Sequence, residues 1–209
     1  MNSREVFPLF STPLTITNNF LPTKYIQPLV EYYKENDDIW LDRGYKFQSM
    51  QTKSKKTLDE HPDVKWYIEK DFNMFIKDML LLEDKYKFSL GTSWGTKTTP
   101  EHASSWHQHS NYFYSGVYYF EESETPIEFQ KPVAGYRYGF EKKDFNIFNN
   151  ETFSVKPEAN SMVYFPSWLE HRIAYHEGDT HRYSIAMNFT PVGTWGTMDS
   201  EISMEMNNG

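Results

Sequence analysis

The chain has 209 residues, with 21 Lys and Arg against 29 Asp and Glu, which gives a formal net charge of -8. An acidic balance of this size disfavours a protein whose main role is to grip nucleic-acid phosphates. Cysteine is absent, which excludes a disulfide framework and a zinc-thiolate site, so any metal must be held by His, Asp or Glu.

The length fits one domain with a substantial core. We expect a single domain over residues 1–192, with helical support at 20–82 and a β core at 86–192, followed by a tail at 193–209. The first residues lack the apolar core of a secretory signal, and no apolar run approaches membrane-spanning length. We therefore expect a cytoplasmic, reducing compartment, in which ferrous iron can persist.

The first part of the chain alternates extended and helical patterns. An opening strand is expected at Glu5–Ile16, and its two prolines favour an edge position. Apolar side chains recur every three to four residues in Pro22–Asn36 and again in Pro62–Leu82, which predicts two helices, the second with a proline in its first turn. Between these helices, Gly44–Ser54 is expected to form a second edge strand.

From residue 86 the apolar period changes to two, as in β-strands. Three strands are expected at Tyr86–Thr98, Tyr112–Phe120 and Ile127–Gln130, and Ser161–Phe165 begins the final set of strands. The connection 131–160, rich in Pro, Gly, Asn and aromatic residues, is either a lid over a pocket mouth or an ordinary surface excursion. Helices followed by strands indicate an α+β, mainly β domain whose helices buttress a strand-built sandwich or barrel.

The last third of the chain predicts a β-hairpin that brings a histidine and an arginine to one face. His171–His176 and His181–Thr190 have strand composition, and Gly178 with Asp179 suits a tight turn between them. Cross-strand partners and alternate residues share a face, so the side chains of His171 and Arg182 would enter one cavity. Four residues of strand separate them, about 13 Å at roughly 3.3 Å per residue. A metal, a short dicarboxylate and an arginine side chain together span about that distance.

A second pair of histidines lies upstream, at His107 and His109. Two imidazoles separated by one residue on an extended chain point to the same side, and with His171 they could cap one face of an octahedral ion. Such a site leaves cis positions open, which suits Fe(II), whereas a structural zinc site closes its shell. A His-x-His pair alone is weak evidence, because histidines so spaced are often polar loop residues.

Arg182 requires a partner if its strand is buried. A carboxylate of the protein would serve, but so would a ligand carboxylate held by the guanidinium fork, with the Ser184 hydroxyl adding a hydrogen bond. If the strand parity of His107 and His109 continues through Tyr112–Phe120, Tyr119 rather than its neighbour shares their face. Tyr119 is therefore a third candidate for the anion site.

Several motifs then match a known family. They are His107–Gln108–His109, the SGVYY of Ser115–Tyr119, the FPSWLEH of Phe165–His171, the RYSIAMNF of Arg182–Phe189 and an opening FPLFSTP at Phe7–Pro13. Together they resemble a small group of 2-oxoglutarate and Fe(II)-dependent oxygenases, across nearly the whole chain. The resemblance implies a double-stranded β-helix, of jelly-roll or cupin type, with iron held by three residues and 2-oxoglutarate by the arginine. The implied metal ligands are His107, His109 and His171, and the implied co-substrate residues are Arg182, Ser184 and Tyr119.

The second ligand position departs from the wider superfamily. Most members have His-x-Asp or His-x-Glu, whereas this chain has His109. Three neutral imidazoles leave the iron site one negative charge poorer, which should alter its affinity for a dianionic co-substrate. His102, His176 or a nearby carboxylate therefore stay open as alternative ligands.

The resemblance implies a dioxygenase that couples decarboxylation of 2-oxoglutarate, giving succinate and carbon dioxide, to hydroxylation of a substrate that the sequence does not identify. No side chain need act as a nucleophile. One rival is a three-histidine iron dioxygenase of cupin type that uses no keto acid, in which Arg182 would bind the substrate's own carboxylate. The other rival is a non-catalytic β-sandwich module for binding or structure.

Overall fold

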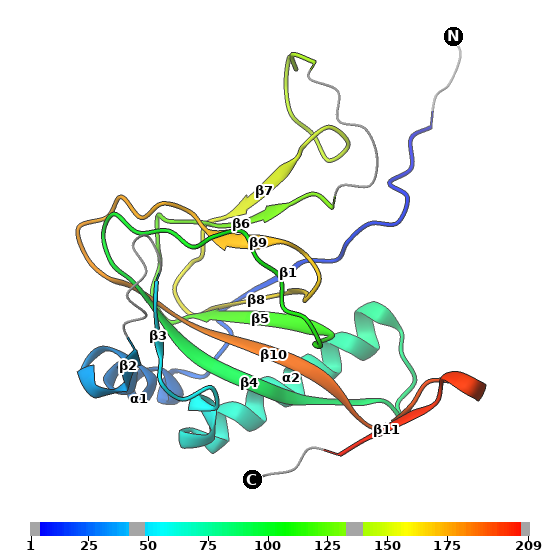
Figure 1. The fold of residues 1–209 in the computed structure, drawn as a ribbon, viewed down its shortest axis with the longest axis horizontal. Coiled ribbons are helices and arrows are strands. Elements are labelled where there is room, and N and C mark those ends of the chain that lie inside the picture. The colour runs from blue at the N-terminus through cyan, green and yellow to red at the C-terminus, as the bar shows by residue number, and fades with distance from the viewer. Residues whose placement is uncertain (1–4, 42–48, 133–139, 206–209) are drawn as a thin grey trace.

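A computed structural model describes residues 5–41, 49–132 and 140–205 of the chain. Within these residues the fold has three layers: two α-helices, a larger sheet of eight strands and a smaller sheet of three strands (Figure 1). The helices cover the outer face of the larger sheet, and the smaller sheet lies across its inner face. The space between the two sheets is where the site is built.

The helices are α1 (Thr23–Lys34) and α2 (Pro62–Leu80), close to the predicted ranges. The longer helix begins with its proline, where a missing N–H costs nothing, and ends at Leu81, which has the left-handed φ of 53° common at helix ends. Its apolar stripe packs on the sheet, and the Phe72 ring stacks on Phe189 with 3.7 Å between centroids. In the described residues no helix is long and apolar enough to cross a bilayer.

The larger sheet is antiparallel throughout. Its strands, in spatial order, are β1 (Thr15–Asn18), β8 (Ser161–Pro166), β5 (Tyr114–Tyr119), β10 (Arg182–Trp195), β4 (Lys87–Thr98), β3 (Met50–Thr52) and β2 (Trp40–Leu41), and β11 (Ile202–Met204) pairs with the end of β10. Side chains alternate across the sheet. On β10, Ile185 and Met187 enter the core shared with the helices, whereas Ala186 belongs to the core between the sheets.

The smaller sheet consists of β7 (Thr152–Val155), β6 (Ile127–Gln130) and β9 (His171–Ile173). Beyond β9, His107 makes an antiparallel bridge with His171. Apolar side chains from both sheets fill one end of the interlayer space, and Phe129 meets Phe165 edge to face across it. Two facing antiparallel sheets of this kind form a double-stranded β-helix, or jelly roll, so the predicted fold class is confirmed.

The predicted hairpin between His171–His176 and His181–Thr190 is wrong. β9 pairs with β6 in the smaller sheet, whereas β10 pairs with β4 and β5 in the larger one. The apolar alternation of a strand marks its buried face but does not say which strand lies beside it. The two segments therefore belong to opposing sheets, and the spacing computed along one hairpin face does not apply.

Two edge predictions are met only in part. The opening strand was expected at Glu5–Ile16, but pairing is confined to Thr15–Asn18, and the Phe10 side chain is 98 % exposed. Two prolines remove backbone donors from this segment, which favours a solvent-exposed chain over a paired strand. Of the strand expected at Gly44–Ser54, residues 44–48 lie outside the described residues and Met50–Thr52 forms β3.

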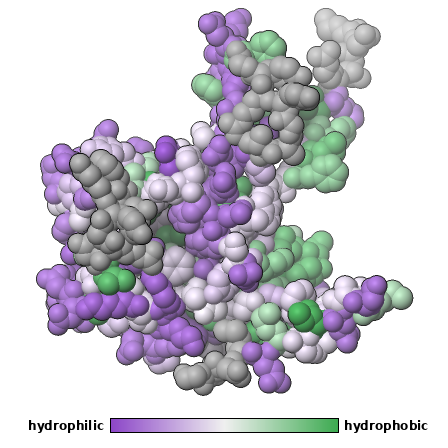
Figure 2. All heavy atoms as spheres, viewed as in Figure 1, coloured by the Kyte–Doolittle hydropathy of each residue, from purple (hydrophilic) through white to green (hydrophobic). Residues whose placement is uncertain are grey.

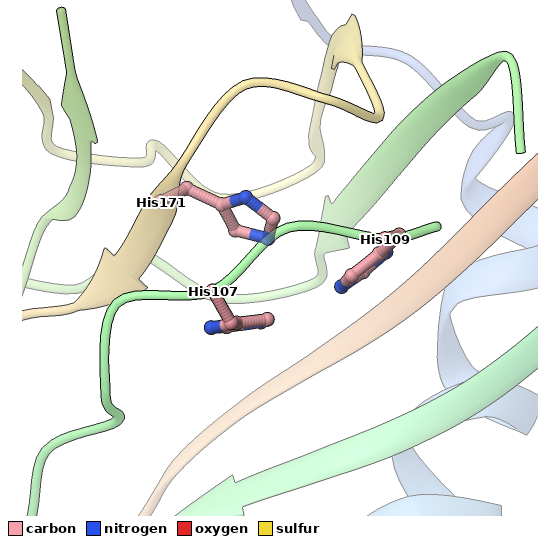
Figure 3. A group of neighbouring side chains, drawn as sticks. All are labelled: His107, His109 and His171. Atoms are coloured by element: carbon pink, nitrogen blue, oxygen red, sulfur yellow. The ribbon is translucent and has the colours of Figure 1, made fainter. Parts of the chain in front are cut away.

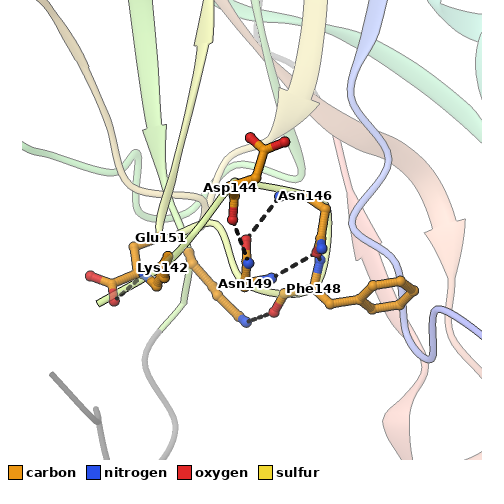
Figure 4. A network of polar contacts seen from close by, with 7 residues as sticks. Lys142, Asp144, Asn146, Phe148, Asn149 and Glu151 are labelled. Carbon is orange, nitrogen blue, oxygen red and sulfur yellow. Dashed lines mark hydrogen bonds and ion pairs between the residues drawn. The ribbon is translucent and has the colours of Figure 1, made fainter. Parts of the chain in front are cut away.

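The connection 131–160 contains β7 and a protruding loop. Hydrogen bonds among residues 144–149 close this loop on itself: Asn146 Oδ1 accepts from the Phe148 N–H at 2.9 Å, and Asn149 Nδ2 donates to the Asp144 carbonyl at 3.0 Å (Figure 4). The protrusion carries several exposed apolar side chains, as the green areas at the top of Figure 2 show. Residues 133–139 lie outside the described part, so a lid role for this connection stays a prediction.

Candidate metal centre

A cavity of about 180 Å³ lies between the two sheets. The larger sheet contributes inward-facing residues of β4, β5 and β10, and the smaller sheet contributes β6 and β9. All six residues predicted to form the site line this cavity: His107, His109, His171, Tyr119, Arg182 and Ser184. The predicted hairpin is wrong, but His171 and Arg182 still enter one cavity. They do so from two opposing sheets, β9 in the smaller and β10 in the larger.

Backbone pairing brings the three histidines together. The segment before β5 runs beside β9, so that the His107 and His171 backbones exchange hydrogen bonds of 3.0 and 2.9 Å, and the His109 N–H donates to the Ser167 carbonyl at 2.9 Å. The three rings converge from these two segments, with one ligand atom from each lying within 4.8 Å of the others (Figure 3). The three rings therefore border one small space, as the ligands of a single shared ion must.

Each histidine uses its Nδ1 for a hydrogen bond within the protein. His107 Nδ1 lies 2.8 Å from the Ser105 carbonyl, and His171 Nδ1 lies 2.9 Å from the Leu169 carbonyl. A carbonyl can only accept, so both rings carry their proton on Nδ1 and present a lone pair at Nε2. This is the arrangement that outer hydrogen bonds impose on metal-binding histidines.

Burial favours the neutral form of two of the three imidazoles. Burial lowers the pKa of His171 to about 3, and the neighbouring His107 and His109 add to the effect. Burial likewise lowers the pKa of His109, against the opposing effect of its hydrogen bond to Asn188. In the described part of the chain no carboxylate joins the cluster. A cation here would meet three imidazole nitrogens and no carboxylate among the described residues.

The other candidate ligands are engaged elsewhere. His102 hydrogen bonds through Nδ1 to Thr99 and to the Pro100 carbonyl. His176 contacts the Thr125 hydroxyl through Nδ1 at 2.6 Å and the carbonyl of the turn after it through Nε2 at 2.6 Å. Neither lies in the cluster.

Arg182 enters the same cavity from the first position of β10. Its residue is 3 % exposed, and its three guanidinium nitrogens are buried without a hydrogen-bond partner among the described residues. The Tyr119 ring lies beneath it, with 5.1 Å from the guanidinium carbon to the ring centre. A cation–π contact of this kind offsets only part of the cost of burying a charge. The protein carboxylate that could have neutralised Arg182 is therefore not found in the described structure.

The strand parity that singled out Tyr119 is confirmed. Val117 and Tyr119 line the cavity, whereas Tyr118 packs in the helix-side core and donates to Asn160 at 2.9 Å. Burial raises the pKa of Tyr119, and the Arg182 charge opposes that shift. The Tyr119 hydroxyl is therefore neutral at physiological pH and remains a hydrogen-bond donor.

Sequence reasoning missed two residues beside the histidines. Trp94 on β4 lies 5.4 Å from His109 between ring centroids, and the Asn188 side chain on β10 contacts His109 Nδ1 at 2.5 Å. Trp94 has an identifiable signal, because it alternates with the inward-facing threonines of its strand. Asn188 shares the predicted cavity face of Arg182, but no spacing rule connects it to His109.

The residues present fit a divalent metal with a dicarboxylate beside it. Imidazole nitrogens suit iron and its neighbours in the transition series. The orphaned, buried guanidinium of Arg182 suits a carboxylate, which it can meet with two parallel hydrogen bonds. The cavity therefore offers a cation site and an anion site side by side.

The comparisons with known proteins agree with this geometry. Residues 92–188 match the family model described as "Putative 2OG-Fe(II) oxygenase". This range includes the three clustered histidines and Arg182. The resemblance predicted from the motifs is confirmed, and family and fold indicate a 2-oxoglutarate-dependent oxygenase, an oxidoreductase. The expected cofactors, Fe(II) and 2-oxoglutarate, are those in the family description. A comparison with curated proteins finds no match.

Solved structures share the fold over most of the chain. A prolyl-4-hydroxylase from Pseudomonas putida superposes with a TM-score of 0.58 at 14 % identity, over 87 % of this chain and 94 % of that one. The epimerase SnoN from nogalamycin biosynthesis gives 0.64 at 7 % identity, over 86 % and 78 %. HygX from Streptomyces hygroscopicus, with nickel, 2-oxoglutarate and hygromycin B bound, gives 0.55 at 8 % identity, over 86 % and 83 %. At these identities the likeness establishes the fold alone.

Proposed function

We propose that the chain is a dioxygenase that uses Fe(II) and 2-oxoglutarate to hydroxylate a substrate, with succinate and carbon dioxide as the co-products. The observation that carries this proposal is the pairing, in one cavity, of a three-histidine cluster with a buried guanidinium that has no partner among the described residues. A histidine cluster alone would suit many metal proteins. The unpartnered cation beside it specifies an anionic co-substrate.

In this proposal His107, His109 and His171 hold the metal through Nε2. Bound iron and the keto acid would supply the oxidising chemistry, in which one oxygen atom enters the substrate and the other enters succinate. Arg182 orients the co-substrate by a charge-assisted bond to its carboxylate, and the hydroxyls of Ser184 and Tyr119 add neutral hydrogen bonds. The rings of Phe129 and Phe165 pack against the His171 ring, with centroids 6.2 and 4.6 Å away, and exclude water from that side of the ligand.

The proposal is tested by succinate formation from 2-oxoglutarate in the presence of Fe(II) and oxygen, with and without candidate substrates. His171→Ala should abolish turnover. Arg182→Ala should raise the KM for 2-oxoglutarate by about 30-fold or more, since removing one partner of a buried charge pair costs roughly 2 kcal/mol at least.

Arg172→Ala is the matched control, because Arg172 also borders the cavity but its charge is already paired with Glu128 at 2.7 Å and it packs on Trp106. It should leave the KM for 2-oxoglutarate unchanged. Equal losses in the two arginine variants, or turnover that survives in His171→Ala, would refute the assignment of the site.

The three-histidine set also supports a second candidate, a cupin-type iron dioxygenase that attacks its substrate without a keto acid. The absence of a carboxylate from the cluster in the described residues favours this alternative. Under it, oxygen consumption with a carboxylate-bearing substrate would proceed without 2-oxoglutarate and without succinate. The same assay therefore separates the two candidates.

A further inference from the structure

A buried polar network lies beside His109, and its residues are not among those that line the cavity. Asn188 Oδ1 accepts from His109 Nδ1 at 2.5 Å and from the Ser115 hydroxyl at 2.8 Å, and Asn188 Nδ2 donates to Thr92 Oγ1 at 3.0 Å. Ser167 Oγ lies 2.9 Å from Ser115 Oγ and completes the chain. Asn188 is 4 % exposed, and every polar atom of its side chain has a partner.

His109 differs from the other two histidines in the kind of group that holds it. His107 and His171 face backbone carbonyls, which can only accept, so their tautomers are fixed by the chain itself. His109 Nδ1 faces a side-chain amide, which can present either an oxygen or an NH₂ group. The Ser115 hydroxyl also lies 3.1 Å from this nitrogen, but its proton is donated to Asn188 Oδ1, so toward His109 it can only accept. The NH₂ group would place the imidazole proton on Nε2 and remove the lone pair that a metal needs.

We propose that Asn188 is a positioning residue that holds His109 as the Nδ1–H tautomer and thereby keeps its Nε2 available as the third metal ligand. The inference rests on the proposed function for the role of Nε2, but the tautomer itself is a property of the metal-free protein. Asn188 acts here through its oxygen, and its own NH₂ group is committed to Thr92 on the neighbouring strand.

The strand arrangement explains why the amide stays in this orientation. β10 and β4 pair in register from Arg182 to Asn188, which places Asn188 opposite Thr92, and the register shifts directly after it. Trp94, two residues along β4, packs against the His109 ring from the side. Trp94 thus fixes the orientation of the His109 ring, and Asn188 fixes its tautomer. An aspartate at position 188 could accept the same hydrogen bond.

The first test reads the tautomer in the metal-free protein by long-range proton–nitrogen spectra of the imidazoles at pH 8. The His109 signals are assigned by their loss in His109→Gln. Wild type and Asn188→Asp should show the Nδ1–H form, and Asn188→Leu should shift His109 toward the Nε2–H form. Thr190→Val, at a buried position of the same strand whose hydroxyl contacts only Met204 among the described residues, should leave the spectrum as in wild type. A wild-type His109 in the Nε2–H form overturns the proposal without any variant.

The second test measures Co(II) affinity by calorimetry in the same four proteins. Loss of an outer hydrogen-bond partner typically weakens metal binding by about 10- to 100-fold, so Asn188→Leu should bind Co(II) that much more weakly. Asn188→Asp should bind at least as tightly as wild type, and Thr190→Val should bind equally. Unchanged affinity in Asn188→Leu overturns the positioning role. If wild type itself binds no Co(II), the proposed function fails. The tautomer measurement still decides whether Asn188 holds His109 in the Nδ1–H form.

Discussion

Arg182 is permanently charged, and its buried guanidinium nitrogens have no hydrogen-bond partner among the described residues. A buried, uncompensated charge lowers the free energy of unfolding, and proteins tolerate such groups chiefly where a ligand will pair with them. The Tyr119 ring offsets only part of that cost. The unpaired charge of Arg182 therefore lowers the stability of the ligand-free protein and raises its affinity for an anionic ligand.

Replacing Arg182 by methionine should therefore stabilise the ligand-free protein while it removes co-substrate binding. The side chain keeps most of its apolar length but loses the charge, and we expect a gain of about 1–3 kcal/mol in the free energy of unfolding. Urea denaturation without metal or 2-oxoglutarate measures it. Arg172→Met, which breaks a half-exposed ion pair, should give no such gain. A loss of stability in Arg182→Met would show that the guanidinium has a partner in the ligand-free protein.

At the scale of elements, the alternation within each strand was predictable and the pairing between strands was not. The parity of β5 and β10 placed Tyr119, Ser184 and Arg182 on the cavity side, and the helical period placed α2 to within two residues. The partners of β9 and β10 follow from how two sheets close over a common core, which a local pattern does not contain. The contact between Asn188 and His109 could not be predicted from a local pattern either, because 79 residues separate them in the sequence.

Gly95 on β4 shows how closely the helical layer approaches the sheet. A Cβ at this position would lie 2.6 Å from Cε1 of Tyr33, a fully buried ring whose hydroxyl donates to Thr57 at 2.8 Å. Gly95→Ala should lower the free energy of unfolding by about 1–3 kcal/mol through overpacking. Chemical denaturation checks this, and the added cost should shrink in a Tyr33→Leu background. An alanine that is neutral in both backgrounds would mean that α1 lies farther from β4 than described.

At the scale of the whole molecule, three histidines have a lower pKa in the folded protein than in the unfolded chain. Burial lowers the pKa of His61 as well as those of His109 and His171. Each group binds a proton more readily in the unfolded chain than in the folded one. Acid therefore favours unfolding, and stability is fully present only above the unfolded-state pKa, near 6.5.

The metal-free protein should accordingly lose stability as the pH falls from 7 to 5. For His171 the folded pKa is about 3, so the loss begins near 6.5 and continues through this interval. Its slope approaches about 1.4 kcal/mol per pH unit for that one group. Thermal unfolding across this range measures the effect, and His171→Gln should flatten the curve. A variant that declines as steeply as wild type would contradict the assignment of the acid sensitivity to His171.

The central claim is that the histidine cluster and Arg182 together bind iron and 2-oxoglutarate. An anaerobic titration with Fe(II) and 2-oxoglutarate tests it most directly, because the keto acid on ferrous iron gives a visible charge-transfer absorption that succinate cannot give. We predict a saturable band in wild type, no band with succinate, and a band in Arg182→Met only at much higher 2-oxoglutarate. Iron binding without any band in wild type would contradict the account.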